Sequence, residues 1–128
     1  MANTSATKSS LPHMLLLANS PAGAVCVNGT NGIISYLNPV LERLTGLRNA
    51  DVSGRRLRDV GLWTSVASGL RLAARLSRGE RIQEALMQLN AATGQAVAAA
   101  VNATVVRLRG GDWHVYQLLK VEPLDRAR

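Results

Sequence analysis

The stretch from Gly23 to Gly46, GAVCVNGTNGIISYLNPVLERLTG, constrains the fold of this chain more than any other. Two runs rich in β-branched and other apolar residues, 24–27 and 33–37, flank a segment of Asn and Gly residues that tolerate positive φ angles. This pattern predicts a β-hairpin. The Asn-Pro pair at 38–39 then predicts a helix start, because an Asn side chain accepts from the free N–H groups of a first turn and Pro is favoured at the first helical position. Gly46 stands where a left-handed C-cap belongs.

Length and cysteine content indicate a single domain in a reducing compartment. The 128 residues are enough for one domain that buries about two-thirds of its unfolded surface. Cys26 is the only cysteine, which fits a protein of the reducing cytoplasm. Its place within an apolar run indicates that its side chain is a small, buried hydrophobic group. The longest apolar run, residues 14–18, is far shorter than the roughly 20 residues that span a membrane. We therefore expect no membrane span.

The charge is strongly basic, with 15 Lys and Arg residues against 8 Asp and Glu and a formal net charge of +7. Such a balance raises nucleic acid as a partner. The Arg residues are scattered, however, without Lys/Arg blocks, and almost no aromatic residues are present for base stacking. The pattern favours a solvated basic surface over nucleic-acid contact.

Two further helices are predicted. Residues 1–9 are small and polar and are read as a disordered lead, after which Ser10 can cap a short helix with residues 14–17 as its apolar body. Thr64 or Ser65 can cap a longer helix that Gly79 ends. Apolar residues recur in it at three- and four-residue spacing, at Val66, Leu70, Ala73 and Leu76 or Ser77. Another face carries three arginines, which we read as solvated: Arg71, Arg75 and Arg78.

Three strands follow the longer helix. They are predicted over residues 82–89, 97–108 and 113–121, with turns at 92–94 and 109–112. One side of the last strand is mainly apolar, with Trp113, Val115, Leu119 and Val121. The other side carries the polar residues His114 and Lys120. Together with the first hairpin, the strands form an antiparallel sheet with helices gathered on one face, which is an α+β fold.

This order of elements, with its Asn-Gly turn, Asn-Pro helix start and Leu-Thr-Gly helix stop, resembles the opening of a PAS domain. The segment 49–57, NADVSGRRL, is similar to the short helical turn and G-R-x-L step that follow the first helix in that family. The resemblance covers roughly residues 20–121 and has no single motif that is diagnostic alone. It implies a five-stranded sheet in which the last strand is central, between the first and the fourth.

The resemblance also implies a domain organisation. Residues 10–123 form the PAS-like sensory domain, and its N-terminal helix either caps the core or pairs with its copy in a dimer; both readings stay open. Residues 124–128 begin a linker to an output domain, so we expect the chain to be the sensory piece of a larger regulator. In many PAS domains an Asp-Ile-Thr step anchors the output helix. Here residues 119–121 read Leu-Lys-Val, which puts coupling through that contact in doubt.

The sequence carries no pattern of an enzyme active site. It has no Gly-rich phosphate loop, no G-x-S-x-G, no H-E-x-x-H and no Cys pair for a metal. A catalytic triad would need a base, and His13 and His114 are the only histidines. We read His114 as a rim or outer-face residue rather than a ligand or a base.

The cofactor cannot be named from the sequence, but two classes are disfavoured. Flavin-binding photoreceptors of the LOV type carry a Cys in a G-x-N-C-R-F-L-Q-G segment, and this chain has no Cys at the matching residues 51–57. Haem-binding members of the oxygen-sensing type use a His on the long helix, and residues 64–78 contain none. Non-covalent flavin or another organic ligand stays open.

Small side chains on one strand raise the question of a pocket. The inner face of the 97–108 strand is predicted to carry only small residues, Val97, Ala99, Val101, Ala103 and Val105, and the chain has no Phe. Either the helices settle closer to the sheet or a void is left for a ligand. A ligand would contact Trp63, Leu70, Met87, Ala99, Val101 and Gln117. Gln117 is placed inward because it shares parity with Val115 and Leu119.

Three functions from different classes follow. The first is a PAS-type sensory or protein-interaction module of a histidine kinase, a cyclic-di-GMP enzyme or a transcription activator, not itself an enzyme, which binds a small ligand and forms a homodimer. The second is a purely structural dimerisation domain without a ligand. The third and weakest is a small basic nucleic-acid binder.

Overall fold

The computed structural model describes residues 17–108 and 110–124. The order of elements is β1 (Gly23–Asn28), β2 (Ile34–Leu37), α2 (Pro39–Thr45), α3 (Asn49–Val52), the 3-10 turn η1 (Leu57–Asp59), α4 (Val66–Ser77), β3 (Ile82–Asn90), β4 (Ala96–Leu108) and β5 (Gly111–Pro123). The predicted lead and the helix start at Ser10 lie outside the described residues, as do residues 125–128 of the predicted linker.

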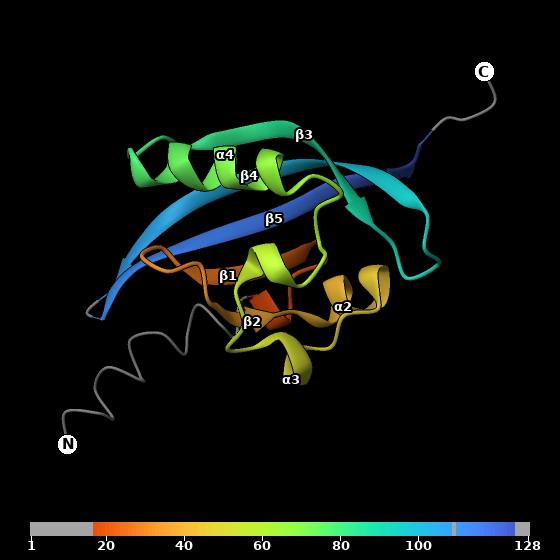
Figure 1. Cartoon of the computed structure of the whole chain (residues 1–128), viewed down its shortest axis with the longest axis horizontal. Helices are drawn as coiled ribbons and strands as arrows, with labels where there is room; N and C mark the ends of the chain where they lie inside the picture. The colour runs from red at the N-terminus through yellow and green to blue at the C-terminus, as the bar shows by residue number, and fades with distance from the viewer. Residues whose placement is uncertain (1–16, 109, 125–128) are drawn as a thin grey trace.

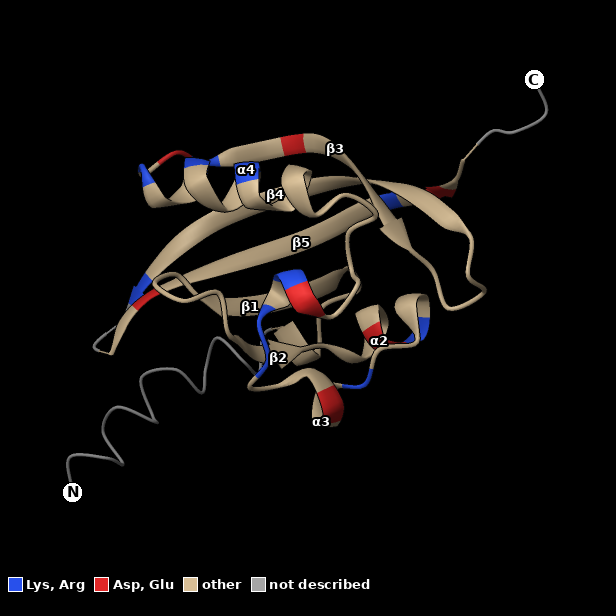
Figure 2. Ribbon diagram, viewed as in Figure 1, with Lys and Arg blue, Asp and Glu red and all other residues tan. Residues whose placement is uncertain are grey.

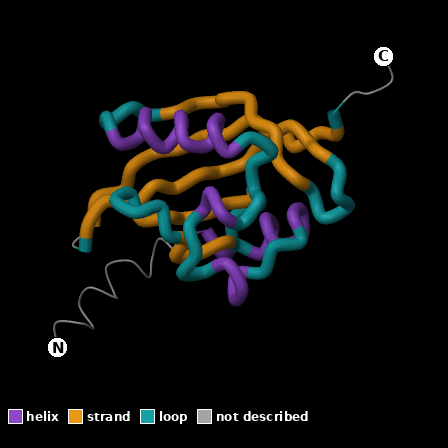
Figure 3. Tube along the Cα trace, in the orientation of Figure 1, coloured by secondary structure: helices purple, strands orange, loops and turns teal. Residues whose placement is uncertain are grey.

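The five strands form one antiparallel sheet in the order β2-β1-β5-β4-β3. The last strand is therefore central, between the first and the fourth, as the sequence resemblance implied. The helices gather on one face of the sheet, with α4 over β3 and β4 and with α2, α3 and η1 beside β1 and β2 (Figures 1 and 3). The predicted α+β fold is confirmed.

Asn38 joins three parts of the fold. Its side chain is fully buried and makes four hydrogen bonds. The amide oxygen accepts from the backbone N–H of Leu41, which caps α2, and from that of Ala24 in β1, at 3.0 and 2.9 Å. The amide nitrogen donates to the carbonyls of Leu17 and Ala22, at 2.8 and 2.9 Å. The predicted cap is confirmed, and its tertiary contacts explain why an Asn with both donor and acceptor stands here.

The main core lies between the sheet and the helices. The small residues predicted on the inner face of β4 all belong to it, together with Ile82, Met87 and Leu89 of β3. A smaller cluster on the opposite face of the sheet consists of Leu17, Ala24 and Cys26. Burial raises the pKa of the Cys26 thiol, so the predicted role of a buried hydrophobe is confirmed.

Lys and Arg residues lie on several separate elements, with acidic residues between them (Figure 2). Glu80 pairs with Arg75 and Arg78 just beyond the end of α4, and Arg107 pairs with Asp112 across the β4–β5 hairpin. Arg71, Arg75 and Arg78 are at least partly exposed, as predicted. In the part of the chain that the structure describes, no helix is long and apolar enough to cross a membrane.

Candidate ligand-binding site

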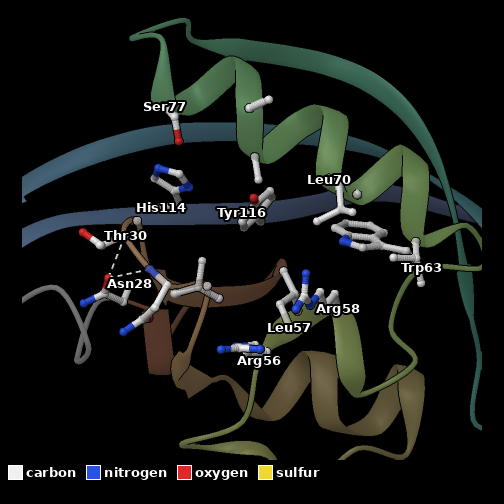
Figure 4. A pocket seen from close by; sticks show the side chains of 18 residues that line it. Asn28, Thr30, Arg56, Leu57, Arg58, Trp63, Leu70, Ser77, His114 and Tyr116 are labelled. Atoms are coloured by element: carbon white, nitrogen blue, oxygen red, sulfur yellow. Dashed lines mark hydrogen bonds between the residues drawn. The ribbon is translucent and has the colours of Figure 1, made fainter.

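A groove of about 480 Å³ opens beside α4, and we call it the α4 groove. It lies between α4, the β1–β2 turn, η1 and the central strand β5 (Figure 4). Cavities of this size hold small organic ligands. It is lined by Val27, Asn28, Gly29, Thr30, Asn31, Gly32, Arg56, Leu57, Arg58, Trp63, Val66, Gly69, Leu70, Ala73, Ala74, Ser77, His114 and Tyr116.

Helix α4 faces two environments at once. Gly69, Leu72 and Leu76 are buried in contact with the rest of the fold. The apolar stripe predicted from the residue spacing does not coincide with this buried face. Its residues line the groove instead, namely Val66, Leu70, Ala73 and Ser77. Val66 and Leu70 are 49% and 46% exposed, and both line the groove one helical turn apart. The helix was predicted correctly, but most of its predicted core face is the wall of the groove.

Trp63 forms one end of the groove floor and is only 6% exposed. Its backbone pairs with Leu89 at the edge of the sheet, and its indole lies directly against the backbone of Gly69 in α4. A Cβ atom on residue 69 would stand 2.4 Å from the indole Cδ1, closer than real contacts allow. The indole also meets the Tyr116 ring edge-on, with 6.0 Å between ring centroids and 63° between planes.

Strand β5 supplies the rest of the floor and requires a correction. His114, Tyr116 and Leu118 are buried toward the helices, whereas Gln117 faces the other side of the sheet. There it lines a separate shallow cavity of about 320 Å³ together with Leu17 and Val115. The predicted inward placement of Gln117 is therefore wrong, and so is the predicted outer or rim placement of His114.

The error lies in the choice of the inner face and not in the parity, because Gln117 does share a face with Val115. Lys120 has φ +50°, and the register between β4 and β5 shifts by one residue beside it. Because of this shift, Val121 packs on the same core as Leu118, although the two differ by an odd number of residues. The inner face was misassigned because β5 carries apolar side chains on both faces, with Trp113 and Val115 outside and Tyr116 and Leu118 inside.

Three buried polar side chains in the groove make no hydrogen bond to any residue that the structure describes. They are the indole N–H of Trp63, the hydroxyl of Tyr116 and the imidazole of His114, whose residues are 6%, 1% and 4% exposed. Figure 4 shows the Tyr116 hydroxyl and the His114 ring turned toward the cavity. Buried groups of this kind pair with a ligand or with ordered water, because an unsatisfied buried donor costs about 1–3 kcal/mol.

Burial also determines the protonation of two of these groups. It raises the pKa of Tyr116 to about 12, so the phenol is protonated at neutral pH. Burial lowers the pKa of His114, against the smaller opposing effect of the Asp112 carboxylate, so the imidazole is neutral. The floor thus presents uncharged hydrogen-bonding groups.

The β1–β2 turn forms the wall beside His114. The side-chain oxygen of Asn28 accepts from the backbone N–H groups of Thr30 and Asn31, at 2.7 and 3.2 Å. The N–H of Gly29 donates to the carbonyl of Asp112 at 2.8 Å. A Cβ atom on residue 29 would stand 2.9 Å from Nε2 of His114, so the close approach of the turn to the imidazole requires glycine.

The opposite wall is cationic. Arg56 and Arg58 flank the buried Leu57 of η1. Arg58 has a 4.0 Å contact with Asp59, whereas the guanidinium of Arg56 has no ion pair or hydrogen bond within residues 17–108 and 110–124. No Asp or Glu among the described residues lines the groove. In the same residues we find no group of three or more His, Cys, Asp or Glu able to hold a metal ion.

Of the six predicted ligand-binding residues, Trp63 and Leu70 line the groove. Met87, Ala99 and Val101 do not, because they are buried in the main core under α4. Ala99 and Val101 have no exposed surface, so above β4 the helix has settled onto the small residues rather than leaving a void. The space lies beside that contact, over β1 and β5. His114 and Tyr116 were missed because the face of Trp113 and Val115 was taken as the inner one, and the two arginines because only the placement of η1 brings them to the groove.

Comparison with known proteins agrees with this architecture. A family model for the PAS fold matches residues 14–119, and this chain therefore belongs to the PAS family. The family consists generally of sensory modules. A search of curated proteins found no match.

Solved structures of PAS and LOV proteins superpose over most of the chain. The LOV protein of Rhodobacter sphaeroides gives a TM-score of 0.73 at 16% identity, covering 94% of this chain and 70% of that one. A domain of a sensory box sensor histidine kinase/response regulator from Geobacter sulfurreducens gives 0.69 at 16% identity, covering 87% and 93%. The PAS domain of the Cronobacter turicensis quorum-sensing receptor RpfR, solved in complex with BDSF, gives 0.65 at 13% identity, covering 81% and 97%. These likenesses show the shared fold.

Proposed function

We propose that this chain is the sensory module of a signal-transduction regulator and that it binds a small organic molecule in the α4 groove. The observation that carries the proposal is a set of three buried polar groups, those of Trp63, His114 and Tyr116, which line one cavity and have no hydrogen-bond partner in the part of the chain that the structure describes. A bound molecule would pair with these groups and cover the exposed apolar side chains of Val66 and Leu70. The module itself is not an enzyme.

A ligand on this floor would act on the central strand of the sheet. Tyr116 and His114 lie on β5, which pairs with both β1 and β4 and ends at Pro123, where the chain leaves the domain. A ligand that binds two arrangements of β5 with different affinity shifts their populations. We propose that this shift is passed to an output domain beyond residue 124, in a cytoplasmic histidine kinase, cyclic-di-GMP enzyme or transcription activator.

The outer face of the sheet is the proposed homodimer surface. Partly buried apolar side chains surround the Leu17–Ala24–Cys26 cluster on that face, namely Tyr36, Trp113 and Val115. A second copy would cover them. Sedimentation at increasing concentration should show a dimer, and Val115→Asp should weaken it while leaving the groove intact.

A purely structural dimerisation domain is the second candidate. The close packing of α4 on Ala99 and Val101 supports it, because the main core is filled without a ligand. This candidate requires a dimer that carries and binds no small molecule.

Native mass spectrometry of the purified chain, together with thermal shifts in a metabolite extract, tests the proposal. We expect a bound molecule or a rise in melting temperature. Ala73→Trp, which fills the groove, should abolish both signals, whereas Ala67→Trp on the exposed side of the same helix should not. A chain that carries nothing and does not respond to the extract would refute ligand binding and favour the structural role.

A further inference from the structure

The α4 groove has one apolar wall and one floor of hydrogen-bond donors. The wall follows α4 from Val66 to Ser77, and this stripe extends about 16 Å at the usual rise of an α-helix. Leu57 faces it across the cavity. A molecule that covers this wall needs an elongated apolar body.

The floor offers three hydrogen-bond donors to a ligand. The indole of Trp63 has a donor only, and the protonated phenol of Tyr116 donates through its hydroxyl. The neutral imidazole of His114 carries one N–H. The phenol oxygen and the second imidazole nitrogen can also accept, but no carboxylate of the described residues lines the groove, so the lining offers no charged acceptor to a ligand.

The charge of the lining favours an anion. Arg56 lies on the wall opposite the floor and has no partner among the described residues, and Arg58 has only the 4.0 Å contact with Asp59. A bound anion would receive favourable interaction from both guanidinium groups, whereas a bound cation would be repelled.

Backbone geometry argues against a phosphate group. Phosphate sites in turns use several free backbone N–H groups. In the β1–β2 turn the N–H groups of Gly29, Thr30 and Asn31 already donate to Asp112 and Asn28. The donors that remain are side-chain groups, namely those of the floor and the two guanidinium groups, and a carboxylate is the smaller anion that they can bind.

From these features we infer that the ligand is an amphipathic organic carboxylate, with its apolar body along α4 and its carboxylate between the donors of β5 and Arg56. This inference rests on the proposed function, because it names the chemical class of the molecule that the groove binds.

Isothermal titration of the purified chain with four probes of equal chain length tests the inference: decanoate, 1-decanol, decyl phosphate and decylamine. We expect decanoate to bind most tightly and decylamine least. Tyr116→Phe keeps the ring and removes the hydroxyl, so it should weaken decanoate about tenfold to a hundredfold and 1-decanol less. Arg56→Gln should weaken decanoate several-fold and leave 1-decanol unchanged. Arg71→Gln, an exposed change on α4 outside the groove, is the control and should alter neither.

The melting temperature of each variant is measured as a control that the variant is folded. Equal binding of decanoate and 1-decanol, tighter binding of decyl phosphate or decylamine, or equal effects of Arg56→Gln and Arg71→Gln would overturn the inference. Binding of none of the four probes would also overturn it. In each case the groove-filling comparison of Ala73→Trp with Ala67→Trp still decides separately whether the groove binds any metabolite.

Discussion

Gly69→Ala tests whether the Trp63 indole can hold its position only because residue 69 has no side chain. The new Cβ would stand 2.4 Å from Cδ1, 2.9 Å from Nε1 and 3.3 Å from Cγ of the indole. Because the ring is rigid and only 6% exposed, it must move as a unit, away from α4 and out of its edge-on contact with Tyr116.

Two effects of opposite sign determine the expected size. Overpacking a buried site costs typically about 1–3 kcal/mol, and the rigid indole places this site at the upper end. Alanine gains about 1 kcal/mol over glycine in a helix interior. We therefore expect the free energy of unfolding to fall by about 2 kcal/mol, or the melting temperature by roughly 5–10 °C for a domain of this size.

Urea denaturation monitored by fluorescence measures both the stability and the ring. Trp113→Phe provides a background in which Trp63 is the only indole. In that background Gly69→Ala should also change the emission of the folded state, since the indole has left its site. Ala67→Gly on the exposed side of α4 measures the helix-propensity effect alone. A Gly69→Ala protein as stable as the parent, with unchanged Trp63 emission, would refute the reasoning.

Three further predictions concern buried polar groups. Asn38→Ala leaves the N–H groups of Ala24 and Leu41 without their acceptor and should lower the free energy of unfolding by about 3 kcal/mol in urea denaturation. Tyr116→Phe removes a hydroxyl that has no partner among the described residues, so without ligand the melting temperature should stay unchanged or rise, and a large fall would contradict the unpartnered hydroxyl. Burial lowers the pKa of His114 below its ordinary 6.5, so the unfolded chain takes up a proton as the pH falls through about 6.5 while the folded chain does not. Stability should therefore be complete above that pH and decline in acid, and His114→Gln should lose this part of the decline in urea titrations at several pH values.

The sequence predicted those parts of the fold that local chemistry specifies. The Asn-Gly turn, the Asn38 cap, the left-handed Gly46 and the Gly-Gly hairpin each constrain only a few neighbouring residues, and each is confirmed. The order of strands, with the last one central, came from resemblance to the PAS family and is confirmed as well.

The candidate site could be predicted only in part. Trp63 and Leu70 were found because they lie just before the long helix and on its predicted apolar face, and a pocket was expected under that helix. Gln117 and His114 were assigned to the wrong faces because β5 carries apolar side chains on both faces, and because the bulge at Lys120 turns Val121 inward as well. Nothing in the local sequence marks Lys120 as the bulged residue.

The chain by itself determined its hairpins, caps, helix ends and the small side chains of β4, because these depend on backbone preferences and on contacts between near neighbours. Tertiary structure decided where the cavity lies and which groups face it. Helix α4 buries Gly69, Leu72 and Leu76 in the fold, and this packing leaves Val66 and Leu70 about half exposed beside the groove. The groove arises from the relative placement of α4, η1 and the β1–β2 turn, and such long-range packing depends on the whole core.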